Sequence, residues 1–207
     1  MPEASTVNGE LLEAFLAERT ARLRVYEPPG IAAVLGAAGR PDRDLKLAAL
    51  EADGIPVLHR RGGGGAVVLS PGQVVLALVT DVASAFASRE YARAINEWFI
   101  EALGSLGVRG LEQLGISDLA IGGRKVLGTS IYRARLLLFY QASLLVSNNV
   151  SLFDRYLEHP HAEPDYRQGR GHESFCTTLR AEGYDLDPVR VIAALEPVAR
   201  RRIKELT

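Results

Sequence analysis

Residues 60–67 read RRGGGGAV, four consecutive glycines behind two arginines. Glycine gives the backbone access to positive φ and lets a ligand approach the amides without a Cβ in the way. Successive N–H groups can then form a concave nest for an anion, and the arginines add donors that match carboxylate or phosphate. The run therefore predicts a backbone cradle for an anionic ligand. The alternative is a flexible glycine hairpin.

The residues on either side indicate what kind of loop this is. No Gly-Lys-Ser/Thr and no helical pattern follow the glycines, so the run is neither a P-loop nor a dinucleotide-binding fingerprint. Residues 54–58 start a strand that runs into the glycines, and residues 66–69 continue as a strand into a turn at 70–73. The glycines are therefore predicted to join two strands.

Hydrophobic periodicity and the positions of glycine and proline predict the other elements. Helices are expected at 9–22, with Asn8 as the N-cap, and at 44–51, 88–103 and 188–206. Strands are expected at 23–26, 31–35, 74–79 and 136–146, and a hairpin at 118–130. Antiparallel strand pairs with separated helices indicate the α+β class, with mixed, mostly antiparallel sheets flanked by helices. The composition shows no break that would mark a linker, so a single domain over residues 1–207 is predicted.

Composition limits the function. Lys and Arg number 24 against 25 acidic residues, so the chain lacks the basic excess that nucleic-acid binding by bulk charge needs. No stretch approaches the roughly 20 apolar residues that span a bilayer, and residues 1–8 lack the basic start and apolar core of a secretory signal. Cys176 is the single cysteine, which fits a reducing compartment. A cytoplasmic protein without a nucleic-acid or membrane partner is predicted.

A second motif is the hairpin at 118–130, where Gly122 and Gly123 separate two strand-like segments. Lys125 lies on the second segment. A lysine on a rigid strand is a compact charge with three donors, suited to a phosphate or a developing oxyanion. Gly128 removes a side chain three positions on, which clears room for a ligand backbone. Alone, Lys125 reads as an ordinary surface lysine; together with the glycine run, a ligand-facing role is favoured.

Both motifs resemble those of one family. Residues 63–67, followed by the Pro-Gly-Gln turn at 71–73, resemble the glycine motif of the lipoate and octanoate branch of the biotin/lipoate protein ligase family. Residues 123–129 resemble its second motif, Gly-Arg-Lys-Val/Ile-x-Gly-Ser/Thr. The resemblance covers roughly residues 23–179 and implies the catalytic-domain fold of that family. A biotin ligase is disfavoured because the Gly-Arg-Gly-Arg loop of that branch is absent.

Some positions depart from the family pattern. Gly62 stands where the family has Ser or Thr, and His59 stands where it has the first of two arginines. Ser117 replaces the usual Asn. Gln141 and Ala142 replace a His-Gly pair found in many relatives, so the acyl pocket is expected to differ in shape or polarity.

The resemblance implies roles for residues of both motifs. Lys125 would bind carboxyl and phosphate oxygens as the catalytic residue. The other implied substrate- or adenylate-binding residues are Arg60, Gly63, Gly64, Gly65, Ala66, Asp118, Gly128 and Thr129. No metal-ligating residue is implied.

A third segment, residues 156–175, resembles a stretch found in single-lysine members of this branch. Arg167 and Arg170 are three positions apart, so one helical turn would place both on one face. They could close over an anion or dock an acidic carrier domain. The alternative is a solvated basic loop, and the residues leave both open.

Three reactions fit the resemblance. The first is that of a lipoate–protein ligase, which uses ATP and Mg²⁺ to form lipoyl-AMP and then modifies a lysine of a lipoyl carrier domain, of the 2-oxoacid dehydrogenase or glycine-cleavage H type. The second is an octanoyl or lipoyl transfer through a Cys176 thioester. However, Cys176 lies outside the Pro-Cys-Gly context of the short transferases and also fits a buried small hydrophobe. The third is adenylate binding without catalysis. The ligase reaction is favoured.

Many ligases of this type carry a small C-terminal domain that assists adenylation. After Leu179 this chain has only Tyr184 and a final helical stretch. The accessory domain is therefore expected to be missing, supplied by a separate protein, or not needed.

Overall fold

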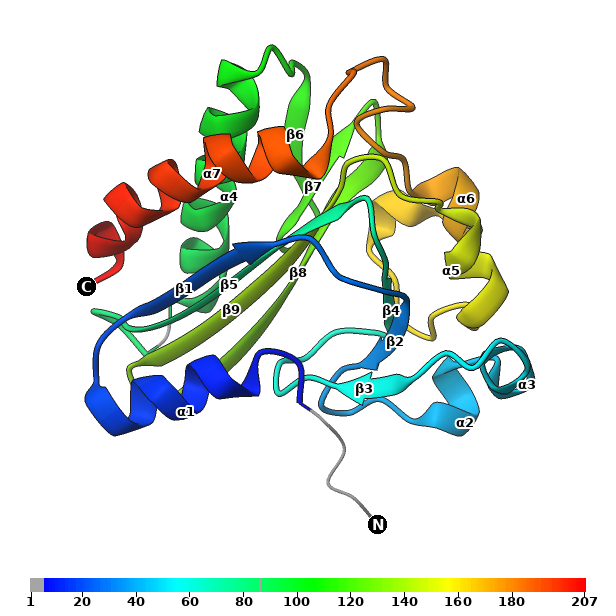
Figure 1. Ribbon diagram of the computed structural model, residues 1–207, viewed down its shortest axis with the longest axis horizontal. Coiled ribbons are helices and arrows are strands. Elements are labelled where there is room, and N and C mark those ends of the chain that lie inside the picture. The colour runs from blue at the N-terminus through cyan, green and yellow to red at the C-terminus, as the bar shows by residue number, and fades with distance from the viewer. Residues whose placement is uncertain (1–5, 86) are drawn as a thin grey trace.

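The computed structural model describes residues 6–85 and 87–207, and within them two sheets form the frame (Figure 1). The larger sheet is antiparallel throughout, in the order β1 (Arg22–Tyr26), β5 (Gln73–Asp81), β9 (Leu137–Leu145), β8 (Arg124–Ala134), β7 (Asp118–Ile121) and β6 (Leu111–Leu114). In the smaller sheet β2 (Ala32–Leu35) lies between parallel β3 (Val57–His59) and antiparallel β4 (Val67–Leu69). The predicted α+β class with mostly antiparallel sheets is confirmed.

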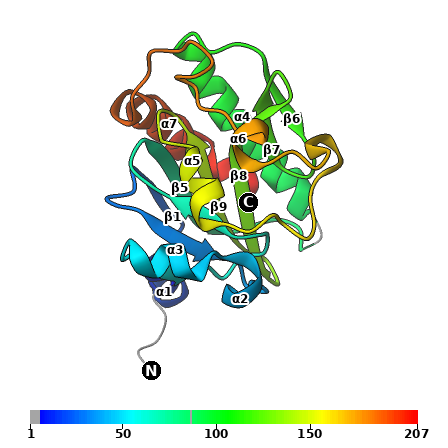
Figure 2. The same ribbon diagram turned by 90° about the vertical axis from the view of Figure 1, so that its right-hand side faces the viewer.

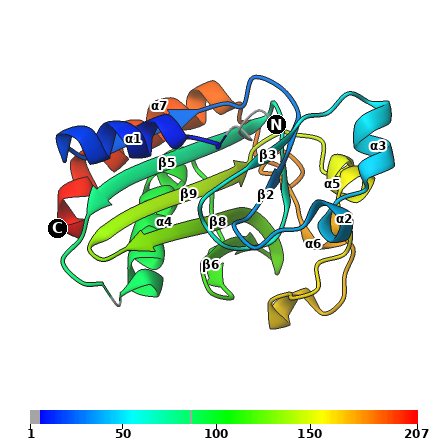
Figure 3. The same ribbon diagram turned by 90° about the horizontal axis from the view of Figure 1, so that it is seen from below.

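Helices cover both faces of the large sheet and one end of the molecule. The long helices α4 (Ser88–Ser105) and α7 (Pro188–Arg202) pack on one face, and α1 (Gly9–Glu18) packs on the other (Figures 1 and 3). The short elements gather beside the small sheet, at the end that faces the viewer in Figure 2. They are α2 (Pro41–Asp44), α3 (Leu47–Ala52), α5 (Ser151–Tyr156) and α6 (His172–Phe175). In the described residues no helix is long and apolar enough to cross a membrane.

Almost all of β5 is buried, because helices cover both of its faces. Leu76 and Leu78 contribute to the cluster that α4 and α7 complete, while Ala77 and Val79 pack with Phe15 of α1. Alternate strand residues point to opposite faces, so an unbroken apolar run is what a strand covered on both sides requires. Burying an aromatic side chain such as Phe15 contributes about 1.5–3 kcal/mol.

A third apolar cluster joins the small sheet to the short helices. Leu35 of β2 and Val68 of β4 pack there with Phe153 of α5 and Phe175 of α6. This cluster fixes the segment 157–176 against the loop between β3 and β4. The two sides of a cleft are thereby held by one core.

Several predicted boundaries need correction. Helix α1 ends at Glu18 instead of residue 22, and Asn8 makes no side-chain cap; its Nδ2 donates to Gln141 Oε1 at 3.1 Å. The helix predicted at 44–51 begins at Leu47, and α2 before it was not predicted. Helix α7 begins at Pro188 as predicted, but beyond Arg202 it continues as a 3₁₀ turn, η2 (Ile203–Leu206). The other predicted strands and the hairpin are present within a few residues.

Candidate functional site

One large cleft, of about 1380 Å³, lies between the small sheet and β8. Typical small-molecule pockets have volumes of roughly 300–1,000 Å³, so this cleft has room for more than one small substrate. Its walls are the glycine loop (residues 62–66), the hairpin of β7 and β8, and the segment 157–176. The structure therefore brings the three sequence motifs to one cavity.

The glycine loop joins β3 to β4, as predicted, and Arg60 holds it from behind. The Arg60 side chain is only 7% exposed. Its Nη2 donates to the carbonyls of Gly63 at 3.0 Å and Gly65 at 2.6 Å, and its Nε donates to Ser130 Oγ at 2.9 Å. Burial lowers the Arg60 pKa to about 10, so the group remains a cation at neutral pH. Its contacts make Arg60 the residue that shapes the loop.

These contacts decide which way the loop amides point. The described peptide bonds are trans, so an N–H points opposite to the carbonyl of the same peptide unit. Because the Gly63 and Gly65 carbonyls point to Arg60, the N–H groups of Gly64 and Ala66 point away from it. Among the described residues, the N–H groups of Gly64 and Gly65 have no hydrogen-bond partner. Gly64 also has a φ of 92°, which other residues rarely adopt. The loop has the form of an anion nest.

Gly62 is explained by Ser130 on the neighbouring strand β8. A Cβ at Gly62 would lie 2.1 Å from Ser130 Oγ, so a side chain there would clash. The Ser130 hydroxyl accepts from Arg60 and donates to the Gly63 carbonyl at 2.9 Å. A hydroxyl is therefore present beside the loop, although it comes from position 130 and not from position 62.

Lys125 and Asp118 form the opposite wall. Lys125 Nζ lies 2.8 Å from Asp118 Oδ1, and the Lys125 side chain is 27% exposed, so it is partly open to the cleft. A Cβ at Gly128 would lie 2.9 Å from Lys125 Cε. The room that Gly128 provides is thus filled by the lysine itself, and not by a ligand backbone as predicted. Thr129 bonds through Oγ1 to Ser117 Oγ.

Tyr166 orients the acid of this pair. Its hydroxyl donates to Asp118 Oδ2 at 2.8 Å. Burial raises the Tyr166 pKa above its ordinary value, and the Asp118 carboxylate raises it further, so the phenol stays protonated and remains a donor. The sequence reasoning missed Tyr166 because 48 positions separate it from Asp118.

Cys176 lies beside Lys125 but is not activated. Its backbone forms a parallel bridge to Lys125, and the side chain is 8% exposed. Burial raises the pKa of the Cys176 thiol to about 11, although the charges of Lys125 and Arg167 act to lower it. About one thiol in ten thousand would be ionised at pH 7. These properties fit the alternative of a buried, small apolar side chain.

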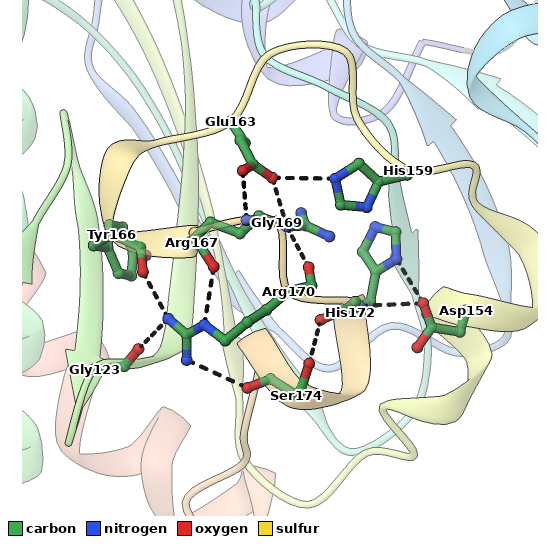
Figure 4. A network of polar contacts seen from close by, with 11 residues as sticks. Gly123, Asp154, His159, Glu163, Tyr166, Arg167, Gly169, Arg170, His172 and Ser174 are labelled. Carbon is green, nitrogen blue, oxygen red and sulfur yellow. Dashed lines mark hydrogen bonds and ion pairs between the residues drawn. The ribbon is translucent and has the colours of Figure 1, made fainter.

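The segment 157–176 closes the third side through a polar network (Figure 4). Arg170 Nη2 donates to the carbonyls of Gly123 at 3.0 Å and Tyr166 at 2.7 Å, which joins the segment to the hairpin turn. Arg167 is 5% exposed and also lines the cleft. The alternative of a solvated basic loop is therefore wrong. Sequence reasoning also missed His172 and Asp154, whose Nδ1–Oδ1 contact is 2.8 Å.

The comparisons with known proteins show the family of the chain. Residues 4–198 match the family model of the lipoyl protein ligase A/B catalytic domain. The chain belongs to this family. In this member of the family, Lys125 and the glycine loop line the same cleft.

The individual proteins that resemble this chain do so at low sequence identity or over part of its length. A lipoate–protein ligase of Streptococcus pyogenes serotype M5 (strain Manfredo) is 34% identical over 106 residues, which are 50% of this chain and 30% of that protein. The chain thus matches less than a third of that enzyme. A bipartite lipoate–protein ligase of Thermoplasma acidophilum superposes with a TM-score of 0.75 at 19% identity, covering 89% of this chain and 72% of that one.

A lipoate–protein ligase A bound with ATP superposes with a TM-score of 0.76 at 19% identity, covering 93% of this chain and 78% of that one. A second Thermoplasma acidophilum protein, with bound lipoic acid, has a TM-score of 0.77 at 16% identity, with 97% and 83% covered. At these identities the solved structures establish the shared fold.

Proposed function

We propose that this chain is a lipoate–protein ligase that forms lipoyl-AMP from lipoate and ATP and transfers the lipoyl group to a carrier lysine. The observation that carries the proposal is the pairing of two oxyanion-binding groups across one cleft. Lys125, held 2.8 Å from Asp118, lies on one wall. The loop with the unpartnered N–H groups of Gly64 and Gly65 lies on another. Family membership supplies the substrate class.

In the adenylation step a lipoate carboxylate oxygen attacks the α-phosphorus of ATP. The bond from that phosphorus to the bridging oxygen breaks, and pyrophosphate leaves with the electron pair. Such reactions depend mainly on positioning and on neutralising oxygen charges. Lys125 would neutralise charge at the carboxyl and α-phosphate oxygens, and the Gly64 and Gly65 N–H groups would fix them in place. The buried Arg60 holds the Gly63 carbonyl and so turns the Gly64 N–H away from itself.

In the transfer step the neutral amine of a carrier lysine attacks the acyl carbonyl of lipoyl-AMP. A tetrahedral oxyanion forms, AMP leaves with the electron pair of the acyl–oxygen bond, and the amine proton passes to solvent. Lys125 and the loop amides would stabilise this oxyanion as well. Removing one such donor typically costs 10²–10³-fold in rate, so the same groups would matter in both steps.

Mg²⁺ is the expected companion of ATP. In the described part of the chain, no group of three His, Cys, Asp or Glu side chains could hold a metal ion. Magnesium bound with nucleotides takes one or two carboxylates and otherwise phosphate oxygens and waters. The cleft suits an ion that arrives on the nucleotide, and we assign it no residues.

The two alternative reactions are less well supported. A Cys176 thioester needs a thiolate, whereas burial raises the pKa of this thiol to about 11. The departures at Gly62, His59 and Gln141-Ala142 all permit a non-catalytic role. For the first of them, Ser130 supplies a hydroxyl beside the loop.

The carrier is proposed to be a lipoyl domain, of the 2-oxoacid dehydrogenase or glycine-cleavage H type. The Thermoplasma acidophilum neighbour was solved as a bipartite ligase together with its E2 lipoyl domain. That precedent supports assays in which a separate accessory protein is added. A cytoplasmic location remains a prediction.

The proposal is tested by lipoate-dependent release of pyrophosphate from ATP, together with the mass of a lipoyl domain after the reaction. We expect pyrophosphate release and a lipoyl adduct on one lysine. Lys125→Ala should lose both by 10²-fold or more, and Cys176→Ala should keep both. Absence of pyrophosphate release with and without accessory proteins would contradict the ligase, and loss of transfer in Cys176→Ala alone would favour the thioester.

A further inference from the structure

A cluster of three nitrogen-bearing side chains on the third side of the cleft, in the segment 157–176, has no role in the chemistry described above. Arg167 belongs to a 3₁₀ turn, η1 (Asp165–Arg167), His159 to the preceding loop and His172 to α6. All three line the cleft. The rings of His159 and His172 lie next to each other, with centroids 6.5 Å apart, and Arg167 lies beside them (Figure 4).

Arg167 is buried with part of its guanidinium unsatisfied. Its Nε donates to the Arg170 carbonyl at 2.9 Å and lies 3.3 Å from Glu163 Oε2. Its Nη2 has no hydrogen-bond partner in the part of the chain that the structure describes, although the residue is 95% buried. Leaving a buried charged donor unpaired is costly. Arg167 also lines the cleft, so its charge can act on an anion bound there.

Each histidine is anchored in the same way, through one ring nitrogen. His172 Nδ1 lies 2.8 Å from Asp154 Oδ1, and His159 Nε2 lies 3.1 Å from Glu163 Oε2. Asp154 is itself held by the backbone N–H groups of His172 and Glu173, both at 3.1 Å. For the other ring nitrogen of each histidine, the described residues provide no partner. Carboxylates on one side thus orient three groups whose remaining nitrogens can donate to an anion.

We propose that Arg167, His159 and His172 form the subsite for the pyrophosphate group that ATP loses in the adenylation step. This inference rests on the proposed ligase function. Phosphate oxygens are the acceptors that a guanidinium and protonated imidazoles match best. The α-phosphate and the acyl carboxyl are already provided for by Lys125 and the loop, so the β- and γ-phosphates are the groups left to place. An acidic side chain of a carrier domain fits less well, because Arg167 lies too deep for a folded partner to reach.

The charges around His172 make this subsite sensitive to pH. Burial lowers the His172 pKa below its ordinary value, and the positive charges of Arg167 and His159 lower it further, while Asp154 acts in the opposite direction. A bound phosphate would add negative charge and raise this pKa. Pyrophosphate affinity should therefore increase as the pH falls through the pKa of free His172, because binding and protonation favour each other.

The direct test is titration of the protein with pyrophosphate, followed by calorimetry and by the ring resonances of labelled histidine. We expect binding in wild type with an upward shift of the His172 pKa. Arg167→Gln should weaken binding about tenfold or more, since each charge-assisted hydrogen bond is worth at least that factor. His159→Gln, at a more exposed position, should weaken it about threefold. Arg155→Gln, a matched change of an exposed arginine outside the cleft, should leave binding unchanged.

A second measurement separates this subsite from the ligase function and from simple misfolding. Transfer from preformed lipoyl-AMP to a lipoyl domain involves no pyrophosphate, so Arg167→Gln should transfer at close to the wild-type rate. Unchanged pyrophosphate binding in folded Arg167→Gln overturns the inference; if that variant does not fold, unchanged binding in His159→Gln does so. If wild type binds pyrophosphate at His172 yet releases none from ATP with lipoate, the ligase proposal fails and the subsite stands.

Discussion

Two buried arginines face the same cleft from different walls, and they differ in what their guanidinium groups bond. Arg60 is 7% exposed and donates to Ser130 and to the carbonyls of Gly63 and Gly65. Arg167 is 5% exposed, yet its Nη2 has no partner among the described residues. The comparison shows that burial and charge alone do not mark a ligand-binding arginine. The bonded donors of Arg60 stabilise the loop, whereas the guanidinium of Arg167 keeps a donor without a partner among the described residues.

Among the changes that test this comparison, the largest effect is expected at Arg60. Arg60→Ala leaves the Gly63 and Gly65 carbonyls without their donor, so we expect a loss of about 3 kcal/mol in the free energy of unfolding. The amide nest would lose its shape, and both adenylation and transfer should fall about 10²-fold. Denaturant titration and the two half-reactions measure this, with the exposed Arg61→Ala as control. An Arg60 variant that transfers normally from lipoyl-AMP would break the comparison with Arg167.

A smaller effect is expected from Gly62→Ser, which restores the residue type of the family motif. The new Cβ would lie 2.1 Å from Ser130 Oγ, and such overpacking costs about 1–3 kcal/mol. Gly62→Ser combined with Ser130→Gly should recover most of that loss, because one hydroxyl then replaces the other. Chemical denaturation of the single and double variants checks this. Additive losses in the double variant would show that the two positions do not exchange roles.

The next prediction concerns His172, on the wall that carries Arg167, and the pH dependence of protein stability. The His172 pKa is lowered in the folded protein, so unfolded chains bind more protons just below pH 6.5 and stability should fall as the pH drops through that region. Pyrophosphate should offset this loss by favouring the protonated ring. We expect the midpoint of thermal unfolding to fall less with acidification when pyrophosphate is present, and His172→Gln to remove most of the difference. An equal pH response with and without pyrophosphate would contradict the coupling.

The smallest effect is expected at Cys176. Cys176→Ala removes a buried sulfur and should cost about 1 kcal/mol of stability. Lipoylation should stay within about twofold of wild type, because a thiol with a pKa of about 11 contributes no nucleophile near neutral pH. Labelling with a thiol reagent should be slow in the folded protein. Rapid labelling below pH 8 would show that burial does not suppress this thiol.

Much of the frame was predictable because its signals are local. The glycines between two strands and the turn at Gly122-Gly123 are set by neighbours in the chain, and both were found. The partners of Arg60 were not predictable, since Ser130 is 70 positions away and reaches the loop only through the sheet register. For the same reason Arg60 was expected to contact a ligand, while the environment of Arg167 was left open. The two arginines differ in whether their guanidinium groups find hydrogen-bond partners in the folded protein. Hydrophobic periodicity in the sequence carries no information on those partners.

The most direct test of the account is a crystal structure with a non-hydrolysable lipoyl-AMP analogue. We expect the acyl carbonyl and the phosphate oxygens within hydrogen-bond distance of Lys125 Nζ and of the Gly64 and Gly65 N–H groups. Arg60 should keep its bonds to the loop, and Arg167 should make no contact with the adenylate. An adenylate phosphate bound to Arg167 with none of the ligand near Lys125 would contradict both the ligase mechanism and the division of roles between the two walls.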